Sequence, residues 1–415
     1  MTSLVTASTR SGVAVIHINN PPVNALTTGV PEGLASSINQ AEKDPAVRAI
    51  VVMGAGRTFI AGADIKELER AAYGDDSALP NLHDLLERIE DCSKPVVMAL
   101  HGTALGGGLE VAMAGHYRVA VHDARMGQPE VNLGIIPGAE GTQRLPRLVG
   151  VEKAIEMCVS GKPISASDAR EGGLVDQLID GELEAGAVQF AVEMAERGGP
   201  HPKTRERAGR AGTGAKEPLF VAGREMARKT RRNMVAPLAV IDAIEAAATL
   251  PFSEGCRRER QIFTECVRSE QCKALIHAFF AERGVSKVPD IPKDTLTIHI
   301  GQVAIIGAGT MGGGIAMACA NAGIPVIVKD SNKQALEAGM ATIRRNYETS
   351  VKRGRFTTSV AEQRIASIRP QIDYDGCETA DLVIEAVFES LALKKEVFAE
   401  LDRVVKPGCI LATNT

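Results

Sequence analysis

The sequence predicts an α/β protein with more than one domain, and three observations support this prediction. Short runs rich in β-branched residues, such as GVAVIHIN (12–19), RAIVVMGA (48–55) and KPVVMALHG (94–102), are separated by helical patterns such as LPNLHDLLERIEDC (79–92). The chain has 415 residues, of which 45% are hydrophobic, so it is too long for one ordinary core. Near its C-terminal end, a glycine-rich turn joins two apolar runs in VAIIGAGTMGGGIAMACANAGIPVIVKD (303–330).

Composition restricts the class of partner. The formal net charge is −4 and the positive residues are scattered, which argues against a nucleic-acid groove or an anionic membrane surface and favours small-molecule chemistry. Eight cysteines occur without a C-x-x-C pair, and Cys158 and Cys319 lie in apolar runs, so we expect reduced, buried thiols and a reducing compartment. The N-terminus lacks a basic segment followed by a long apolar core, and no apolar stretch is long enough to span a bilayer. We therefore expect a soluble, intracellular protein that is not secreted.

Two breaks divide the chain into three expected regions. The stretch GGPHPKTRERAGRAGTGAKEP (198–218) is rich in Gly, Pro and charge and reads as an exposed connection that ends a first domain. The sequence SEGCRRERQIFTECVRSEQCKALIHAFFAERG (253–284) predicts a helix with Ser253 as N-cap and Gly284 as its stop, its basic residues forming a solvated face. A second break, GVSKVPDIPKD, follows. The expected regions are a first domain (1–198), a helical linker (199–290) and a last domain (291–415).

The glycine motif of the last domain predicts dinucleotide binding. Gly307, Gly309 and Gly312 follow an apolar run and open a helix: the first permits a tight turn, the second lets the backbone approach a pyrophosphate, and the third allows close packing of helix and strand. The next apolar run ends on Asp330, at the spacing where a carboxylate accepts from a ribose 2′-hydroxyl, and no Arg follows it. We therefore predict NAD rather than NADP.

The last domain lacks an obvious catalytic group. Two further strand-like runs flank a charged helix in ADLVIEAVFESLALKKEVFAELDRVVKPGCILATNT (380–415), but no histidine lies beyond His299. A hydride-transferring enzyme needs an acid or base near the nicotinamide. One interpretation is therefore that this domain binds nucleotide and catalyses nothing alone.

Three glycine- and alanine-rich turns in the first domain offer the missing chemistry. They are RTFIAGADIKEL (57–68), HGTALGGGLEVAMAG (101–115) and GQPEVNLGIIPGAEGTQRLP (127–146). Small residues expose backbone N–H groups, so Ala63 and Gly107 are candidate donors to an enolate oxygen, and Glu110 and Glu130 are candidates for proton transfer. Each feature also has a structural interpretation: the triple glycine as close packing, Glu110 as a capping carboxylate and Glu130 as a solvated loop acid.

These three turns resemble the crotonase, or enoyl-CoA hydratase/isomerase, family. With KALIHAFFAERG (273–284), AIIGAGTMGGGIA (304–316) and DLVIEAVFESLALKKEVF (381–398), the whole chain resembles the multifunctional β-oxidation enzymes of peroxisomal type 1 and their bacterial relatives. The resemblance implies an N-terminal crotonase-type ββα spiral domain, a helical linker and a C-terminal Rossmann doubly wound NAD-binding domain of a 3-hydroxyacyl-CoA dehydrogenase.

The resemblance also implies that the dehydrogenase is incomplete. The chain stops at TNT, where the family continues into its catalytic serine, histidine and glutamate, so we expect a piece of a longer protein. Dehydrogenase activity is expected only with the missing C-terminal part. This chain is expected to bind NADH weakly and not to oxidise 3-hydroxyacyl-CoA.

Roles for individual residues follow from the same resemblance. Ala63 and Gly107 would be the oxyanion donors, and Glu110 and Glu130 the catalytic acids. The resemblance further implies that Ala61 meets the adenine of CoA through its carbonyl, that Lys66 contacts a phosphate and that Gly138 lies near the thioester. Besides the three glycines, the expected NAD contacts are Met311, Asp330, Val387, Glu389, Lys394 and Asn414. Glu389 can equally be a solvated acid at a helix start.

The expected activity is hydration of trans-2-enoyl-CoA to 3-hydroxyacyl-CoA, with isomerisation of 3-enoyl-CoA to 2-enoyl-CoA as a secondary activity. Coenzyme A carries the substrate, NAD serves the dehydrogenase part, and no metal is expected. We expect a monomer with a thiolase as candidate partner, in the cytoplasm of a bacterium or the peroxisome of a eukaryote. Two alternatives stay open: another crotonase-family enzyme, such as a thioester hydrolase or a dehalogenase, and a non-catalytic NAD-binding scaffold.

Overall fold

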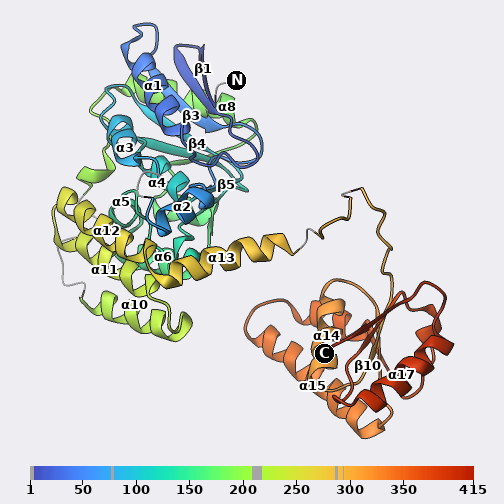
Figure 1. Ribbon diagram of the computed structural model, residues 1–415. Coiled ribbons are helices and arrows are strands. Elements are labelled where there is room, and N and C mark those ends of the chain that lie inside the picture. Colours follow the sequence, from blue (N-terminus) through green and yellow to red (C-terminus); the bar gives the residue numbers. More distant parts are fainter. Residues whose placement is uncertain (1–3, 76–78, 208–216, 286–287, 293) are drawn as a thin grey trace. The chain divides into compact units, whose positions relative to one another are not determined.

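The chain forms two compact units, Met1–Val288 and Pro289–Thr415, in a computed structural model (Figure 1). The structure describes residues 4–75, 79–207, 217–285, 288–292 and 294–415. Both units combine parallel strands with helices, so the predicted α/β class is confirmed.

The main sheet of the first unit has six strands, and the strand sequences account for its burial. Strand β3 is buried along its whole length, as expected for a parallel strand covered on both faces, and its neighbours β2 and β4 are nearly as apolar. Strand β1 pairs antiparallel with β2, and the remaining pairs are parallel. In spatial order the strands are β1 (Val5–Arg10), β2 (Val13–Ile18), β3 (Ala49–Gly54), β4 (Val96–Leu100), β6 (Tyr117–Val121) and β9 (Gln177–Ile179).

Helices cover both faces of this sheet. Alternate residues of the strands face opposite sides, so Val15 and Val51 pack with helix α8 (Leu183–Arg197), whereas Ile16 and Ile50 belong to the larger core on the other face. The helices that contribute to that larger core include α1 (Val30–Lys43), α3 (Leu82–Glu90) and α4 (Gly107–Ala114). Figure 1 shows α1 and α8 on either side of the strands.

The turns that carry the sequence motifs meet beside a second, three-stranded sheet. Isolated β-bridges join Ile60 to Ala104 and Leu26 to Ala63, which brings the first two turns together. The sheet has the order β5 (Thr103–Leu105), β7 (Arg125–Gly127) and β8 (Ile164–Ser165). The elements around it are α2 (Ile65–Ala72), the 3-10 helix η1 (Glu130–Leu133), α5 (Gly141–Val149), α6 (Val151–Ser160) and α7 (Ala166–Gly172).

The helices expected in the linker belong to the first unit. Helix α11 packs against α5 and α6, α12 packs against α5, and α13 contacts α2 and η1. Buried apolar side chains such as Ile244 and Ile262 join the core of the first domain. The bounds are η2 (Thr204–Glu206), α10 (Glu217–Thr230), α11 (Ala236–Thr249), α12 (Phe252–Val267) and α13 (Glu270–Gly284). Part of the predicted exposed connection, residues 208–216, lies outside the described residues.

One predicted helix is two helices. The prediction that Ser253 caps a helix reaching Gly284 is wrong, because Pro251 is the N-cap of α12 and Ser253 lies inside its first turn. Ser269 interrupts the segment and caps α13, its hydroxyl accepting from the N–H of Cys272 at 3.1 Å. A Ser with a β-region backbone that supplies its own cap bond favours a new helix start over continuation.

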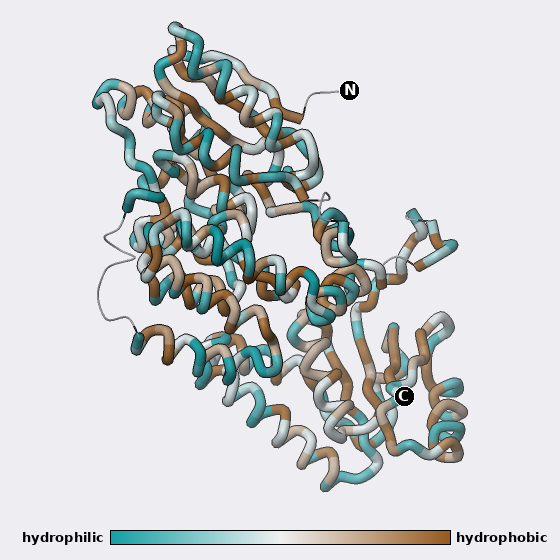
Figure 2. Tube along the Cα trace, turned by 60° about the vertical axis from the view of Figure 1, so that its left-hand side comes forward, coloured by the Kyte–Doolittle hydropathy of each residue, from teal (hydrophilic) through white to brown (hydrophobic). Residues whose placement is uncertain are grey.

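Hydropathy follows this packing. Along the helices, the tube in Figure 2 alternates between hydrophobic and hydrophilic residues, as expected where one face of a helix is buried. Within the described part of the chain, no helix has the length and apolar character to cross a membrane. Cys158 is fully buried as expected, whereas Cys319 is only half-buried.

The second unit is a five-stranded parallel sheet between helices, as the Rossmann prediction requires. Its core on one face includes Leu336 and Tyr347 of α15, and its core on the other includes Val397 and Leu401 of α17. The strand order is β12 (Ile368–Gln371), β11 (Val326–Lys329), β10 (Val303–Ile306), β13 (Leu382–Glu385) and β14 (Ile410–Thr413). The other elements are α14 (Thr310–Asn321), α15 (Lys333–Lys352), α16 (Thr358–Ala366), η3 (Cys377–Thr379) and α17 (Leu391–Val404).

A buried ionic network ties three elements of the first unit together. Arg144 of α5 donates to both carboxylate oxygens of Glu90 in α3 at 2.8 and 2.9 Å, and to Glu140 at 2.8 Å. Glu90 also accepts from the backbone N–H of Arg205 in η2 at 2.9 Å. Because Arg144 and Glu90 are fully buried, neither charge can return to water when the other is removed.

Replacement Arg144→Met is therefore expected to lower the free energy of unfolding of the first unit by about 3–5 kcal/mol, since it removes the buried guanidinium that both Glu90 and Glu140 pair with. Urea unfolding measures this loss. The matched control is Arg224→Met, which removes the ion pairs of Arg224 with Asp242 and Glu245 near the surface and is expected to cost about 0–1 kcal/mol. Equal losses in the two variants would contradict this interpretation.

Candidate active site

Two backbone N–H groups from different turns lie side by side. A Cβ atom built on Gly107 would lie 3.8 Å from the amide nitrogen of Ala63. Among the hydrogen bonds of the described residues, neither the Ala63 nor the Gly107 N–H has an acceptor. Gly107 is the first residue of α4, where the backbone N–H groups of a helix have no partner within the helix. The pair can therefore bind one oxygen atom that carries negative charge.

The triple glycine has a separate role at each position. A Cβ on Gly108 would collide with the carbonyl oxygen of Ile60, so this glycine permits close packing. Gly106 has a φ of 53° and, with a side chain, would lie 2.6 Å from Glu130 Oε1. The structural interpretation of the motif therefore holds for Gly108, while Gly107 keeps a free N–H.

Glu110 is a buried carboxylate held by a distant loop. Its side chain is 3% exposed, and Oε1 accepts from the N–H groups of Ala139 and Gly141, both at 2.9 Å. Burial raises the pKa of Glu110 to about 7, and these two hydrogen bonds hold the increase down. The alternative that Glu110 caps its own helix is wrong, because its carboxylate accepts from Ala139 before α5 and from Gly141 at the start of α5.

Glu130 lies next to the start of the helix that carries Glu110. It is the first residue of η1 and is half-buried, which contradicts the interpretation as a solvated loop acid. With its amide nitrogen turned toward Glu130, Gln128 donates to both carboxylate oxygens at 3.1 and 3.2 Å. Burial raises the pKa of Glu130 well above its ordinary value, and the charge of Glu110 raises it further. The two carboxylates are therefore close enough to influence each other.

The remaining predicted residues of this unit lie on the same turns with different surroundings. Ala61 is half-buried, and Lys66 is exposed in the first turn of α2, where Asp64 accepts from its N–H at 2.7 Å. Gly138 contacts a side chain that the sequence analysis did not single out: a Cβ there would lie 2.6 Å from Cγ of Phe263 in α12.

Sequence reasoning also missed Glu259 of α12. This glutamate is fully buried, and its carboxylate accepts from the backbone N–H groups of Glu140 and Thr142 at 2.7 and 2.9 Å. A signal was present, because Cys256, Ile262 and Cys266 place Glu259 on the apolar stripe of an amphipathic helix. A charged residue on such a stripe is unusual and needs a buried partner.

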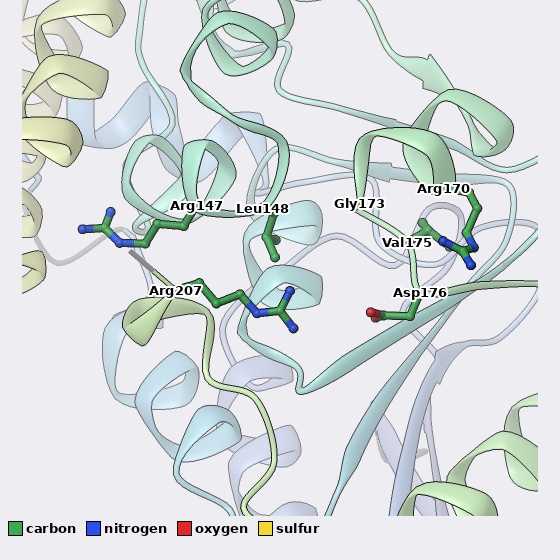
Figure 3. Close-up of a pocket in the computed structure, with 7 residues that line it drawn as sticks. All are labelled: Arg147, Leu148, Arg170, Gly173, Val175, Asp176 and Arg207. Carbon is green, nitrogen blue, oxygen red and sulfur yellow. The ribbon is translucent and has the colours of Figure 1, made fainter. Parts of the chain in front are cut away.

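One hollow of the first unit lies away from this site. A pocket of about 500 Å³ lies at the C-terminal end of α5, whereas the loop bound by Glu110 lies at its start. Figure 3 shows the side chains of Arg207 and Asp176 pointing toward each other across it. Its lining residues are Arg147, Leu148, Arg170, Gly173, Val175, Asp176 and Arg207. None of the predicted site residues lines this pocket.

The second unit has the backbone geometry of a dinucleotide turn. Gly307 has a φ of 113°, and a Cβ there would lie 2.5 Å from the carbonyl oxygen of Ala386. A Cβ on Gly312 would collide with the carbonyl of Gly307, whereas Gly309 at the start of α14 faces open space. Met311 is exposed beside it. The helix N-terminus and the open face at Gly309 fit a pyrophosphate, so the residues present suit NAD.

The other predicted nucleotide contacts cluster at the carboxyl ends of the strands. Asp330 follows β11 and accepts from the N–H of Ala308 at 3.0 Å, which places it beside the glycine turn. Lys394 pairs with Glu389 at 2.5 Å and with Glu385 at 3.2 Å. Glu385 is a buried residue that the sequence analysis did not single out, and it links the predicted contacts Val387 and Asn414. Its side chain accepts from the N–H of Val387, and its backbone carbonyl accepts from the N–H of Asn414.

Comparison with known proteins finds a family match in each of the two units. Residues 8–233 match the enoyl-CoA hydratase/isomerase family, and residues 302–415 match the NAD binding domain of 3-hydroxyacyl-CoA dehydrogenase. The chain belongs to the enoyl-CoA hydratase/isomerase family. The resemblance stated from the sequence motifs is thus confirmed.

Relatives with both regions are similar over nearly the whole chain. The glyoxysomal fatty acid beta-oxidation multifunctional protein MFP-a of Cucumis sativus is 40% identical over 412 residues, which cover 97% of this chain and 57% of that protein. The peroxisomal bifunctional enzyme of Danio rerio is 39% identical over 413 residues, covering 98% of this chain and 55% of that protein. This member of the enoyl-CoA hydratase/isomerase family therefore spans little more than half the length of these curated relatives.

Solved structures support the fold of the first unit. EchA1_1 from Mycobacterium paratuberculosis is 27% identical with a TM-score of 0.50, and the match covers 67% of this chain and 96% of that one. An enoyl-CoA hydratase from Bacillus halodurans, 17% identical with a TM-score of 0.50, shows likeness of fold alone over 66% of this chain and 100% of that one. The predicted crotonase-type fold is confirmed.

The raised pKa of Glu110 predicts a pH-dependent stability. A carboxyl with a pKa of about 7 in the folded state and 4.5 in the unfolded chain binds more protons when folded, so the free energy of unfolding falls as pH rises through this window. Replacement Glu110→Gln keeps an oxygen that accepts from Ala139 and Gly141 but removes the charge. Between about pH 5 and pH 8, this variant is therefore expected to lose less stability than the unchanged protein.

Urea unfolding at the two pH values measures the difference. The control is Glu152→Gln, an exposed first-turn glutamate of α6 whose replacement should leave the wild-type loss intact. If Glu110→Gln loses as much stability as the unchanged protein, the carboxyl of Glu110 is not the group that titrates.

Proposed function

We propose that the first unit hydrates trans-2-enoyl-CoA to 3-hydroxyacyl-CoA in fatty-acid β-oxidation. The observation that carries this proposal is the meeting of two carboxyls of raised pKa with two free N–H groups from neighbouring turns. The names of the relatives support the pathway, since they describe β-oxidation multifunctional proteins. We propose a peroxisomal location in a eukaryote or a cytoplasmic one in a bacterium, a monomer, and a thiolase as candidate partner.

The N–H groups of Ala63 and Gly107 hold the thioester oxygen. Addition of water at C3 moves negative charge onto this oxygen, and two preformed backbone donors stabilise that charge without reorganising. Loss of one such donor in comparable sites costs about 3 kcal/mol of barrier. Leu26 and Leu82 flank Gly107, with methyl carbons 3.1 and 3.6 Å from its Cβ position, and exclude water from the oxygen.

The two glutamates divide the proton transfers. Glu110, whose pKa is about 7, is partly ionised at neutral pH, and its Oε1 is fixed by two N–H groups, so the other oxygen takes a proton from the attacking water. Burial and the charge of Glu110 raise the pKa of Glu130, which favours its protonated form, and Glu130 delivers its proton to C2. After product release, transfer of the proton from Glu110 to Glu130 restores the starting state.

The same residues support isomerisation of 3-enoyl-CoA as a secondary activity. This reaction removes a proton from one carbon and returns it to another without water, and a single carboxyl can carry it between C4 and C2. Glu130 is the candidate shuttle. Ala61 is proposed to meet adenine and Lys66 a phosphate of CoA, with Gly138 near the thioester.

The second unit is proposed to bind NAD. Gly307, Gly309 and Gly312 would hold the pyrophosphate at the start of α14, and Asp330 the adenosine ribose, with Met311, Val387, Glu389, Lys394 and Asn414 as further contacts. When bound, NAD supplies a hydride acceptor for 3-hydroxyacyl-CoA. The residues described here bind and orient that group.

Replacements Glu110→Gln and Glu130→Gln are each expected to lower kcat for crotonyl-CoA hydration by at least about 10³-fold, because each removes one proton transfer. CoA binding, followed by calorimetry, should stay within about twofold, since neither residue contacts the nucleotide end of the ligand. The control Glu152→Gln should keep full activity. The same variants are assayed with 3-enoyl-CoA, where Glu130→Gln should lose isomerisation and Glu110→Gln should retain part of it.

Near-wild-type hydration by either site variant would exclude the two-glutamate mechanism. A wild-type chain that binds CoA thioesters but hydrolyses or dehalogenates them instead would assign it to another branch of the family. A wild-type chain that binds NADH but converts no acyl-CoA would favour a scaffold.

NADH is expected to bind the second unit, and Asp330→Asn is expected to reduce the preference for NADH over NADPH, because the amide no longer repels a 2′-phosphate. Fluorescence of the reduced nucleotide reports binding in a chain that contains no tryptophan. The control is Asp373→Asn, since Asp373, like Asp330, accepts from the N–H two residues on. Absence of NADH binding by the wild-type chain would contradict the assignment of the glycine turn.

A further inference from the structure

We infer that Glu259 of α12 is a positioning residue of the hydration site, because it binds the same four-residue backbone stretch that binds Glu110. This inference rests on the proposed hydration. Helix α12 lies in the segment that the sequence analysis expected to be a linker, and the inference gives it a function at the hydration site.

The stretch 139–142 divides its N–H groups between the two carboxylates in strict alternation. Ala139 and Gly141 donate to Glu110 Oε1, both at 2.9 Å. Glu140 donates to Glu259 Oε1 at 2.7 Å, and Thr142 donates to Glu259 Oε2 through its N–H at 2.9 Å and its hydroxyl at 2.5 Å. Four consecutive peptide groups are therefore held from two directions.

This stretch needs such support from outside. Glu140 has a φ of 67°, in the left-handed region that residues with side chains rarely occupy. The stretch 139–142 also includes the first residues of α5, whose N–H groups have no partner within the helix. Glu259 supplies these groups with acceptors and opposes any shift of the stretch. Because a peptide plane is rigid, a shift at residues 140 and 142 also moves the N–H groups that fix Glu110.

Glu259 lies close enough to the candidate catalytic acids for their charges to interact. Besides Glu110, the titratable groups facing it are Glu130 of η1, Glu140, Cys158 of α6 and Cys256 of its own helix. Burial, followed by the charge of Glu110, raises the pKa of Glu259 well above its ordinary value, and Glu259 in turn raises the pKa of Glu130. Removal of this carboxylate therefore lowers the pKa of Glu130.

The test is the pH dependence of crotonyl-CoA hydration by Glu259→Gln. The N–H of Glu140 faces Oε1 of Glu259, whereas the N–H and hydroxyl of Thr142 face Oε2, so an amide presents its NH₂ to one of these sets of donors. We expect kcat to fall about tenfold or more with KM within about twofold, since Glu110 loses its orientation but the CoA contacts stay. The limb of the kcat profile that reports Glu130 is expected to move to lower pH. The matched control is Glu254→Gln on the exposed face of α12, which should leave kcat and both limbs unchanged.

A second variant covers the case in which Glu259→Gln fails to fold. Thr142→Val removes only the hydroxyl bond to Glu259 and keeps the backbone bond. We expect a several-fold fall in kcat, rescue by Thr142→Ser, and less than additive loss when Thr142→Val is combined with Glu259→Gln.

The outcomes separate this inference from the proposed function. A wild-type chain that does not hydrate crotonyl-CoA overturns the proposed function and this inference with it. Wild-type hydration with unchanged kcat in both Glu259→Gln and Thr142→Val overturns the inference alone. The inference is also overturned if a variant has a smaller fraction of folded, active molecules but an unchanged kcat per folded molecule and an unchanged kcat–pH profile. If Glu259→Gln is insoluble, wild-type kcat in Thr142→Val overturns the inference.

Discussion

Carboxylates removed from water need hydrogen-bond donors, and this constraint organises the first unit. Glu110 and Glu259 are both buried, and neither has a cation among its hydrogen-bond partners. Their donors are backbone N–H groups at the start of α5, which would otherwise lack partners. The same hydrogen bonds therefore supply donors to the buried carboxylates and acceptors to the N–H groups at the start of the helix. The cost is a raised pKa, which is also what proton transfer near neutral pH requires.

The buried Arg144 shows the opposite solution in the same helix. Here two carboxylates, Glu90 and Glu140, share one guanidinium that neutralises charge. Glu140 therefore has a lowered pKa: burial alone would raise it, and the bonds from His83 and Arg144 overcome that effect. The same turn of backbone thus holds one glutamate whose pKa is lowered, Glu140, and contacts two whose pKa values are raised, Glu110 and Glu259.

Local patterns in the sequence predicted much of this arrangement. Short runs rich in β-branched residues predicted the strands, and the glycine spacing predicted the turn before α14, because both depend on residues close together in the chain. The sequence also indicated Glu110 and Glu130, whose roles stay predictions. The position of Glu259 on an apolar stripe indicates a buried acid, but its partners lie 117 and 119 residues away, a distance that no local pattern bridges. Ser253 was misread because a capping residue type is common, whereas cap geometry depends on the backbone of the whole turn.

The packing of α10–α13 on the first domain has a consequence for how such proteins can be assembled from parts. A recombination event that joined residues 1–198 to a different partner would transfer both candidate acids but leave Glu259 and Phe263 behind. It would also expose the apolar surface that α11 and α12 cover. The heritable module is therefore the whole of Met1–Val288. Any lineage that exchanged the nucleotide-binding unit for another domain would have to cut the chain after α13.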